Sequence, residues 1–147
     1  ICRPLHDPSG GLATLKERLV PYPPPLKRAI VNRFLWAAEF DLAQAVKVAA
    51  QGDVYSAAGC FTRVASHLVQ ILYALNERYF VSDKGALDEM RGLGLCPPAL
   101  AETLVEVLSR PGHTPSELSE SASRLSAALR DLVALAGNLY ERPSFRA

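Results

Sequence analysis

The sequence predicts an all-α protein, an up-and-down helical bundle of four to five main helices with a central apolar helix. Apolar residues recur at alternating intervals of three and four along several long segments, which is the spacing of one buried face of an α-helix. No useful length of the chain alternates with period two, as a half-buried strand does. Short turns marked by proline or glycine separate the periodic segments, so neighbouring helices are expected to pack against each other.

The size and charge of the chain favour one globular bundle. Its 147 residues can bury a sizeable core, and 49% of them are hydrophobic. Lysine and arginine total 16 against 15 acidic residues, which leaves a net charge of +1. A chain so close to neutrality carries no strong overall signal for nucleic acid or for an anionic membrane surface.

Three features of the sequence predict a cytoplasmic location. No apolar run approaches the roughly 20 residues that span a bilayer, and no signal peptide precedes the predicted fold. Cys2, Cys60 and Cys96 are odd in number and far apart, so neither a disulfide framework nor a zinc site is predicted. Cys60 lies within an apolar helical stretch and is expected to be a small core residue.

The chain is expected to divide into a short leading segment and a bundle. Residues 1–25 are predicted to be a linker and a short helix that leave an upstream catalytic domain, and residues 26–147 to form the helical bundle domain. The chain begins without methionine, and residues 1–5 are extended in character, like the end of a strand. These features suggest a fragment of a longer protein.

The leading segment contains a helix-start signal and a helix-breaking connector. Asp7 followed by Pro8 is suited to start a helix that runs to about Leu19, because proline at the first helical position loses no hydrogen bond. Four prolines between Val20 and Pro25 then require an extended connector.

The two longest predicted helices follow one another. The first runs from about Leu26 to Gln51, where Gly52 ends it. The second runs from about Asp53, its N-cap, to Phe80. It is the most apolar segment of the chain and is therefore expected at the centre of the bundle. Its apolar stripe consists of Phe61, Val64, Ala65, Leu68, Ile71, Leu72 and Leu75.

Three further segments complete the predicted bundle. A short one runs from Lys84 to about Leu93, and Pro97-Pro98 opens the next. Residues 114–117, Thr-Pro-Ser-Glu, form a capping box with proline at the first helical position. The last helix is expected to run from there to about Leu139.

The central helix also carries a polar stripe opposite its apolar one. Arg63, His67, Gln70, Glu77 and Arg78 fall within about a third of its circumference. The stripe is either a solvated face with ordinary ion pairs or one wall of a polar groove, because buried polar groups without partners cost about 1–3 kcal/mol each. Only three residues separate Arg63 from His67, which is too few for the Arg-x(4–6)-His motif of HEPN-type ribonucleases.

Two polar residues interrupt apolar faces and need partners there. Asp41 lies on the apolar face of the preceding helix, where a carboxylate is costly unless it is paired, and Arg63 or Tyr55 can pair with it. A structural ion pair or hydrogen bond is favoured for Asp41 over a role in a site. Asn76 ends the apolar stripe and is either a C-terminal cap or a residue that fixes a loop or a ligand.

Arg78, Lys84 and Arg91 are predicted to lie together after the central helix. They either complement the helix macrodipole or meet phosphate oxygens presented by a neighbouring domain. The chain contains no Gly-x-x-x-x-Gly-Lys loop, no Gly-x-Gly-x-x-Gly, no Asp-x-Asp pair and no Gly-x-Ser-x-Gly. Catalysis by this chain alone is therefore not expected.

Residues 55–80, followed by Asp83-Lys84-Gly85, resemble part of a known superfamily. The likeness centres on residues 72–80, Leu-Tyr-Ala-Leu-Asn-Glu-Arg-Tyr-Phe, with a lysine a few residues on. This stretch resembles the C-terminal helical, substrate-binding domain of bacterial nucleotidyltransferase-superfamily proteins of the kanamycin-nucleotidyltransferase-like kind. Residues 5–10 also resemble the exit from the catalytic domain in that superfamily. The resemblance covers roughly residues 1–90.

The resemblance implies a two-part enzyme that transfers a nucleoside monophosphate from a nucleoside triphosphate. An upstream nucleotidyltransferase catalytic domain would carry the Gly-Ser loop and the acidic magnesium ligands. Mg²⁺ and a nucleoside triphosphate are therefore expected for the full-length protein, and no cofactor for this chain. The helical domain would pack on the catalytic domain and help to bind the nucleotide or a small-molecule acceptor. The residues assigned to this binding are Arg63, His67, Gln70, Asn76, Arg78 and Lys84, with no catalytic residue and no metal ligand among them.

A second class of function stays open. The chain is alternatively a non-catalytic helical interaction or dimerisation module, such as an antitoxin-like partner of a separate nucleotidyltransferase, and a homodimer is compatible with either class. The coding sequence upstream of Ile1 distinguishes the two classes, because only the first requires a Gly-Ser loop with paired aspartates there. No motif in the chain identifies the acceptor or the preferred nucleotide.

Overall fold

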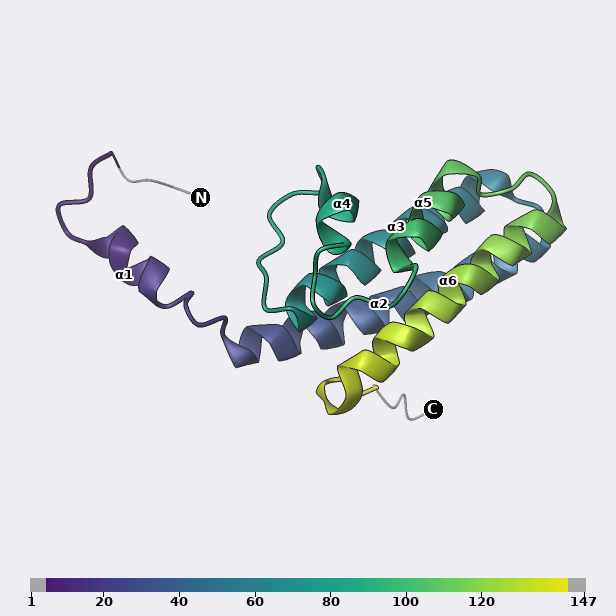
Figure 1. Cartoon of the computed structure of the whole chain (residues 1–147). Helices are drawn as coiled ribbons and strands as arrows, with labels where there is room; N and C mark the ends of the chain where they lie inside the picture. The colour runs from purple at the N-terminus through teal and green to yellow at the C-terminus, as the bar shows by residue number, and fades with distance from the viewer. Residues whose placement is uncertain (1–4, 143–147) are drawn as a thin grey trace.

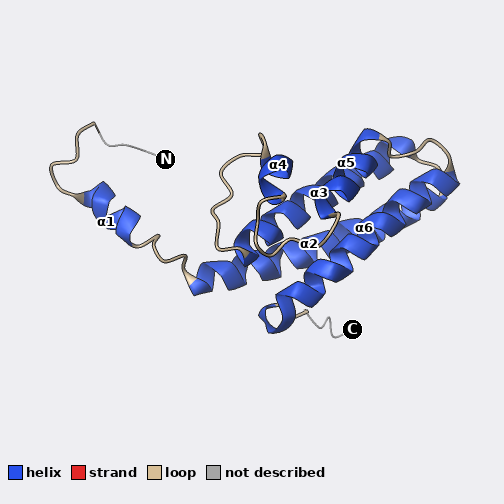
Figure 2. Ribbon diagram, in the orientation of Figure 1, coloured by secondary structure: helices blue, strands red, loops and turns tan. Residues whose placement is uncertain are grey.

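The protein is an all-α helical bundle, as the sequence predicts. The computed structural model describes residues 5–142, which contain six α-helices, one short 3₁₀ helix and no strand (Figures 1 and 2). Cys2 and most of the predicted strand remnant lie outside the described residues. No helix in the described part is long and apolar enough to cross a membrane.

Two long helices form the middle of the bundle. Helix α2 spans Pro24–Ala50 and helix α3 spans Val54–Leu75, and the two pack along each other (Figure 1). The turn between them needs Gly52, whose φ of 73° is in the left-handed region. Asp53 then caps α3 by accepting a hydrogen bond of 3.0 Å from the Ser56 N–H.

Helix α3 is the central helix, as predicted. It buries 12 of its 22 residues, including Cys60, and packs against α2, α4, α5 and α6. Leu68, Ile71 and Leu72 are fully buried within it. Its apolar stripe therefore forms the middle of the core, and Cys60 is the small core residue that its setting predicts.

The predicted end of the central helix at Phe80 is wrong, because the helix ends at Leu75. Asn76 is the C-cap, and Glu77 has a left-handed φ of 56°. The Arg78 N–H donates to the Tyr73 carbonyl at 2.9 Å, and the Glu77 N–H donates to the Ala74 carbonyl at 3.1 Å. This pair of bonds is a Schellman motif, which terminates the helix without glycine. The polar residues after Leu75 therefore lie on a loop.

Two more helices, α5 and α6, complete the bundle. Helix α5 spans Leu100–Ser109, and helix α6, spanning Pro115–Ala136, lies across both α2 and α3. The predicted capping box is confirmed, because Thr114 Oγ1 accepts from the Glu117 N–H while the Glu117 carboxylate accepts from the Thr114 N–H. The last helix stops at Ala136, short of the predicted Leu139, and a 3₁₀ turn follows over Gly137–Leu139.

The short helices begin later than predicted. Helix α4 spans only Ala86–Met90, because Gly85 before it has a left-handed φ of 78°. Helix α1 spans Gly11–Glu17 and does not start at Pro8. Asp7 still caps it, since its carboxylate accepts bonds from the N–H groups of residues 12 and 13 at 3.0 and 3.2 Å.

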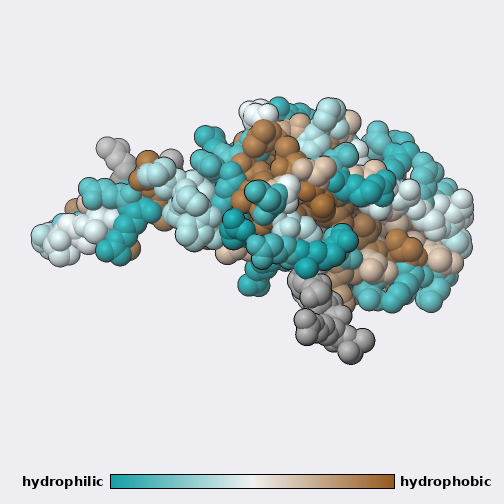
Figure 3. Space-filling view, turned by 90° about the horizontal axis from the view of Figure 1, so that it is seen from below, coloured by the Kyte–Doolittle hydropathy of each residue, from teal (hydrophilic) through white to brown (hydrophobic). Residues whose placement is uncertain are grey.

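Helix α1 stands apart from the bundle as an arm (Figure 1). None of its residues is buried, and no other described helix packs against it. Leu15 on the arm is 57% exposed, and Leu19 just after it is also exposed. Figure 3 shows such hydrophobic atoms at the surface of both the arm and the bundle. The arm therefore has an apolar side that the described bundle leaves uncovered.

Candidate functional site

A polar cluster joins α2 to α3 at Asp41. The Arg63 Nε donates to Asp41 Oδ1 at 2.9 Å, and His67 Nε2 lies 3.0 Å from Asp41 Oδ2. The Asp41 side chain is only 13% exposed, so both carboxylate oxygens have a partner where water is scarce. The predicted pairing of Asp41 with Arg63 is confirmed. Tyr55, the other predicted partner, is 91% exposed and does not take part.

His67 is held in place by its surroundings. Because the Asp41 carboxylate can only accept, the Nε2 atom that faces it carries a proton. Nδ1 is buried and has no hydrogen-bond partner among the described residues. The ring of Phe34 lies 5.6 Å from the imidazole, centroid to centroid. His67 is thus fixed between an aromatic ring and a carboxylate, with one nitrogen unused.

Arg63 reaches two groups. Besides Asp41, its Nη2 lies 3.2 Å from the Cys60 sulfur. The hydrogen bond to Asp41 raises the pKa of the Arg63 guanidinium above its usual value. Gln70 lies farther along the same helix, half-buried, and forms no hydrogen bond in the described structure. Arg63 and His67 therefore serve mainly to fasten α3 to α2.

Asn76 fixes a loop. Its amide nitrogen donates to the Leu72 carbonyl at 2.8 Å and to the Leu95 carbonyl at 3.0 Å. Its amide oxygen accepts from the Leu95 N–H at 2.8 Å. The residue is thus both a C-terminal cap and a loop anchor. Its amide is already bonded on both sides, which leaves little of it for a ligand.

Arg78 and Lys84 are the two predicted binding residues with unengaged cations. Both are exposed on the loop that joins α3 to α4, and neither side chain forms a hydrogen bond or an ion pair with a described residue. Arg91, which was predicted to lie beside these two, is already paired with Asp88 at 2.6 Å and with Glu102 at 2.8 Å. Arg78 and Lys84 are thus left available to an anion.

The loop that carries these two cations is fastened to the connector before α2. The Tyr79 hydroxyl donates to the Leu19 carbonyl at 2.9 Å, and the Tyr79 ring lies 4.6 Å from that of Tyr22, centroid to centroid. Lys27 at the start of α2 pairs with Glu77 at 3.2 Å. We call these contacts the clasp. The clasp places the Arg78 and Lys84 loop at the root of the α1 arm.

The structure therefore divides the six predicted binding residues among three places. Arg63 and His67 belong to the α2–α3 cluster, with Gln70 beyond them, and Asn76 anchors the Leu95 loop. Along the helix, Arg63 is about 20 Å from Asn76. Arg78 and Lys84 share the loop at the root of the arm. No single groove contains all six.

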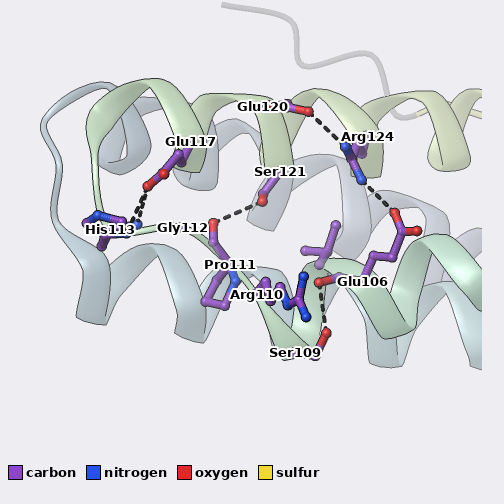
Figure 4. A pocket seen from close by; sticks show the side chains of 11 residues that line it. Glu106, Ser109, Arg110, Pro111, Gly112, His113, Glu117, Glu120, Ser121 and Arg124 are labelled. Carbon is purple, nitrogen blue, oxygen red and sulfur yellow. Dashed lines mark hydrogen bonds and ion pairs between the residues drawn. The ribbon is translucent and has the colours of Figure 1, made fainter.

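A hollow between α5 and α6 was not anticipated from the sequence. It is open, encloses about 930 Å³, and lies where the chain turns from one helix to the other (Figure 4). Arg124 bridges Glu106 at 2.6 Å and Glu120 at 2.8 Å on its walls, while Arg110 forms no ion pair with a described residue. Besides the capping box at Thr114 and Glu117, the sequence signal at this place is the Glu120–Arg124 spacing of four, which is common on exposed helices.

The remaining walls of the hollow are structural. The Ser121 hydroxyl donates to the Pro111 carbonyl at 2.9 Å, and Glu117 belongs to the capping box. Gly112 is required, because a Cβ there would lie 2.6 Å from the Cβ of Glu117. No group of three His, Cys, Asp or Glu side chains in residues 5–142 could hold a metal ion. Most charged side chains that line the hollow are therefore already in ion pairs and not available to a ligand.

The family comparison covers the first half of the bundle. A family described as a domain of unknown function, DUF4037, matches residues 3–84. The chain belongs to this family. No curated protein and no solved structure matches the chain significantly. The DUF4037 region includes α1, α2, α3 and all six predicted binding residues, and it ends at Lys84, before the α5–α6 hollow.

Proposed function

We propose that this DUF4037 chain is the helical substrate-side domain of a bacterial, cytoplasmic nucleotidyltransferase, and that it is not catalytic alone. The observation that carries the proposal is the position of Arg78 and Lys84. Their loop is held by the clasp at the root of an arm that leaves the bundle. Two free cations at the junction with a catalytic domain are suited to the phosphates of a nucleotide or to an anionic acceptor.

The arm supports the same proposal. The side chains of Leu15 and Leu19 are exposed. A helix as short as α1 is only marginally stable in water unless it packs against something. A catalytic domain preceding the arm would cover this apolar side. That domain would supply Mg²⁺ and the nucleoside triphosphate. The two described cysteines, Cys60 and Cys96, form no disulfide, which fits the cytoplasm.

The first test is the sequence upstream of this chain, and the second is calorimetry on the full-length protein. A Gly-Ser loop with paired aspartates is expected upstream. With a non-hydrolysable nucleoside triphosphate and Mg²⁺, Arg78→Ala or Lys84→Ala should weaken binding about tenfold, or about 1.4 kcal/mol. Arg130→Ala, an exposed arginine on α6, is the control and should bind normally. Unchanged binding in both variants, with helicity retained, would remove both residues from the site.

The second candidate is a non-catalytic interaction module. The observation in its favour is the aromatic pair on α2, Trp36 and Phe40, which remain 39% and 54% exposed in the described structure. An upstream sequence without the Gly-Ser loop and its aspartates would favour this candidate over the first.

A further inference from the structure

Helix α2 buries one continuous seam of residues. The buried positions recur at alternating intervals of four and three, which keeps them on one side of the helix. They face α3 and α6. The residues of this buried seam are Val31, Leu35, Ala38, Leu42, Ala45 and Ala49.

A second seam with the same spacing runs along the opposite side of α2. At about 100° per residue, its mean direction is about 150° away from the buried seam. All of its members are exposed, and Trp36 and Phe40 remain 39% and 54% exposed. We call it the outer seam. Its residues are Ala29, Arg33, Trp36, Phe40, Ala43, Lys47 and Ala50.

The chemistry of the outer seam is aromatic at the centre and cationic on both sides. The rings of Trp36 and Phe40 stack on each other with their centroids 5.8 Å apart. Arg33 and Lys47 flank them and form no ion pair with a described residue. The nearby Glu39 is already bonded to the Tyr140 hydroxyl at 2.8 Å and to the Arg142 guanidinium. The seam therefore has apolar surface and two unpaired positive charges, with no acid of its own.

We propose that the outer seam docks an acidic amphipathic helix of a partner protein or domain. Alternating intervals of three and four are what a helix needs to receive the side chains of a second helix along its length. The alanines allow close approach on either side of the aromatic pair. Carboxylates on the partner, about 21 Å apart, would meet Arg33 and Lys47.

Charge disfavours two other occupants. A second copy of this chain would bring four cations and no acid into one seam, which leaves the charges unpaired as water is removed. Nucleic acid presents phosphates far more densely than two cations in about 21 Å can neutralise. The inference does not depend on the nucleotidyltransferase proposal, because it involves neither Arg78 nor Lys84.

Trp36 is the only tryptophan of the chain, so its fluorescence reports directly on the outer seam. The probe is a synthetic amphipathic helix as long as α2, with leucines at the seam spacing and glutamates placed to face Arg33 and Lys47. A second peptide with lysine in place of each glutamate is its control. The acidic peptide is expected to shift the emission to shorter wavelength in a saturable way, and the basic peptide to leave it unchanged. An unchanged spectrum with the acidic peptide, or an equal shift with the basic one, would overturn the proposal.

Charge exchange makes the test specific. In the double variant Arg33→Glu, Lys47→Glu, the affinity for the acidic peptide should fall by at least about tenfold, and the basic peptide should now bind. Arg130→Glu, on α6, is the matched control and should behave as the unmodified chain. Circular dichroism checks that the helices are retained. If the double variant binds the acidic peptide as before, the two cations are not the recognition groups and the proposal fails.

Two further measurements test the other occupants. Concentration-dependent dimerisation in sedimentation velocity, abolished by Phe40→Ser, would assign the seam to a second copy and overturn the proposal. A single-stranded oligonucleotide that shifts Trp36 emission more strongly than the acidic peptide would assign it to nucleic acid and overturn it as well.

Discussion

The Tyr79 hydroxyl donates a hydrogen bond of 2.9 Å to the main-chain carbonyl of Leu19, sixty residues earlier in the chain. This bond joins the loop after the central helix to the connector before α2. Leu19 lies two residues after the end of α1, so the bond reaches the base of the arm. The position of the arm relative to the bundle thus depends on a small number of contacts made by one loop.

Tyr79→Phe should loosen this junction without unfolding the bundle. The variant keeps the ring contact with Tyr22 and loses only the hydrogen bond, which contributes about 0.5–1.5 kcal/mol. Hydrogen exchange should become faster over residues 19–27 and stay unchanged in α3. Tyr55→Phe is the control, because Tyr55 is exposed and its hydroxyl has no described partner. Equal exchange in the two variants would show that the clasp does not depend on this bond.

Asp41→Ala should destabilise the bundle more than Arg63→Ala does. Removing the shared carboxylate leaves His67 and Arg63 without their acceptor, and His67 is largely buried. A loss of about 1–3 kcal/mol is expected from urea unfolding. Arg63 is 55% exposed on its side chain, so its own removal should cost less. The opposite order would mean that the guanidinium, and not the carboxylate, holds the cluster together.

Burial, and then a hydrogen bond to Glu89, raises the pKa of the Tyr73 phenol from 10 to about 12. In the folded protein, Tyr73 therefore keeps its phenolic proton at a pH where the unfolded chain has lost that proton. The resulting stability is complete below about pH 10 and is lost as the pH rises towards 12.

Tyr73→Phe should flatten the alkaline limb of the stability curve. Thermal unfolding measured across this pH window would show a smaller loss of stability than in the unmodified chain. Tyr140 shares the effect, since burial and its bond to Glu39 raise its pKa to about 12 as well. Tyr140→Phe should therefore remove a separate part of the slope. An unchanged slope in both variants would contradict the assignment.

Leu68→Ala and Leu15→Ala should have very different effects. Leu68 is fully buried in α3, so its truncation leaves a cavity and should cost about 2–5 kcal/mol. Leu15 on the arm is 57% exposed and should cost almost nothing in this chain. Denaturant unfolding of both variants tests the pair. A large loss with Leu15→Ala would mean that the arm packs on the bundle in solution.

Helical periodicity predicted the bundle because core burial decides the fold, and the buried residues of α2, α3 and α6 recur at helical spacing. The end of α3 was missed for a local reason. Glu77 adopts a left-handed backbone, which sequence rules assign to glycine or asparagine, and the long apolar pattern ran up to it.

The candidate site was predictable only where two residues needed each other. Asp41 on an apolar face required a partner, and of the two that the sequence offers, Arg63 and Tyr55, it is Arg63 that pairs with it. The sequence could not predict which polar side chains remain without a hydrogen-bond or ion-pair partner, because the positions of the loops decide this. Asn76 is occupied by Leu95 and Arg91 by Glu102, while Arg78 has no such partner. Distances between segments far apart in the chain decide this, and no spacing rule encodes them.

At Glu77, the backbone conformation and the side chain favour different residues. A glycine there would adopt the left-handed backbone with less strain, by about 1 kcal/mol. It would also remove the carboxylate that reaches Lys27 at the start of α2. A sequence optimised only for helix termination would therefore free the loop from α2. The Glu77 carboxylate thus ties the loop that carries Arg78 and Lys84 to α2, at a backbone conformation that glycine would adopt with less strain.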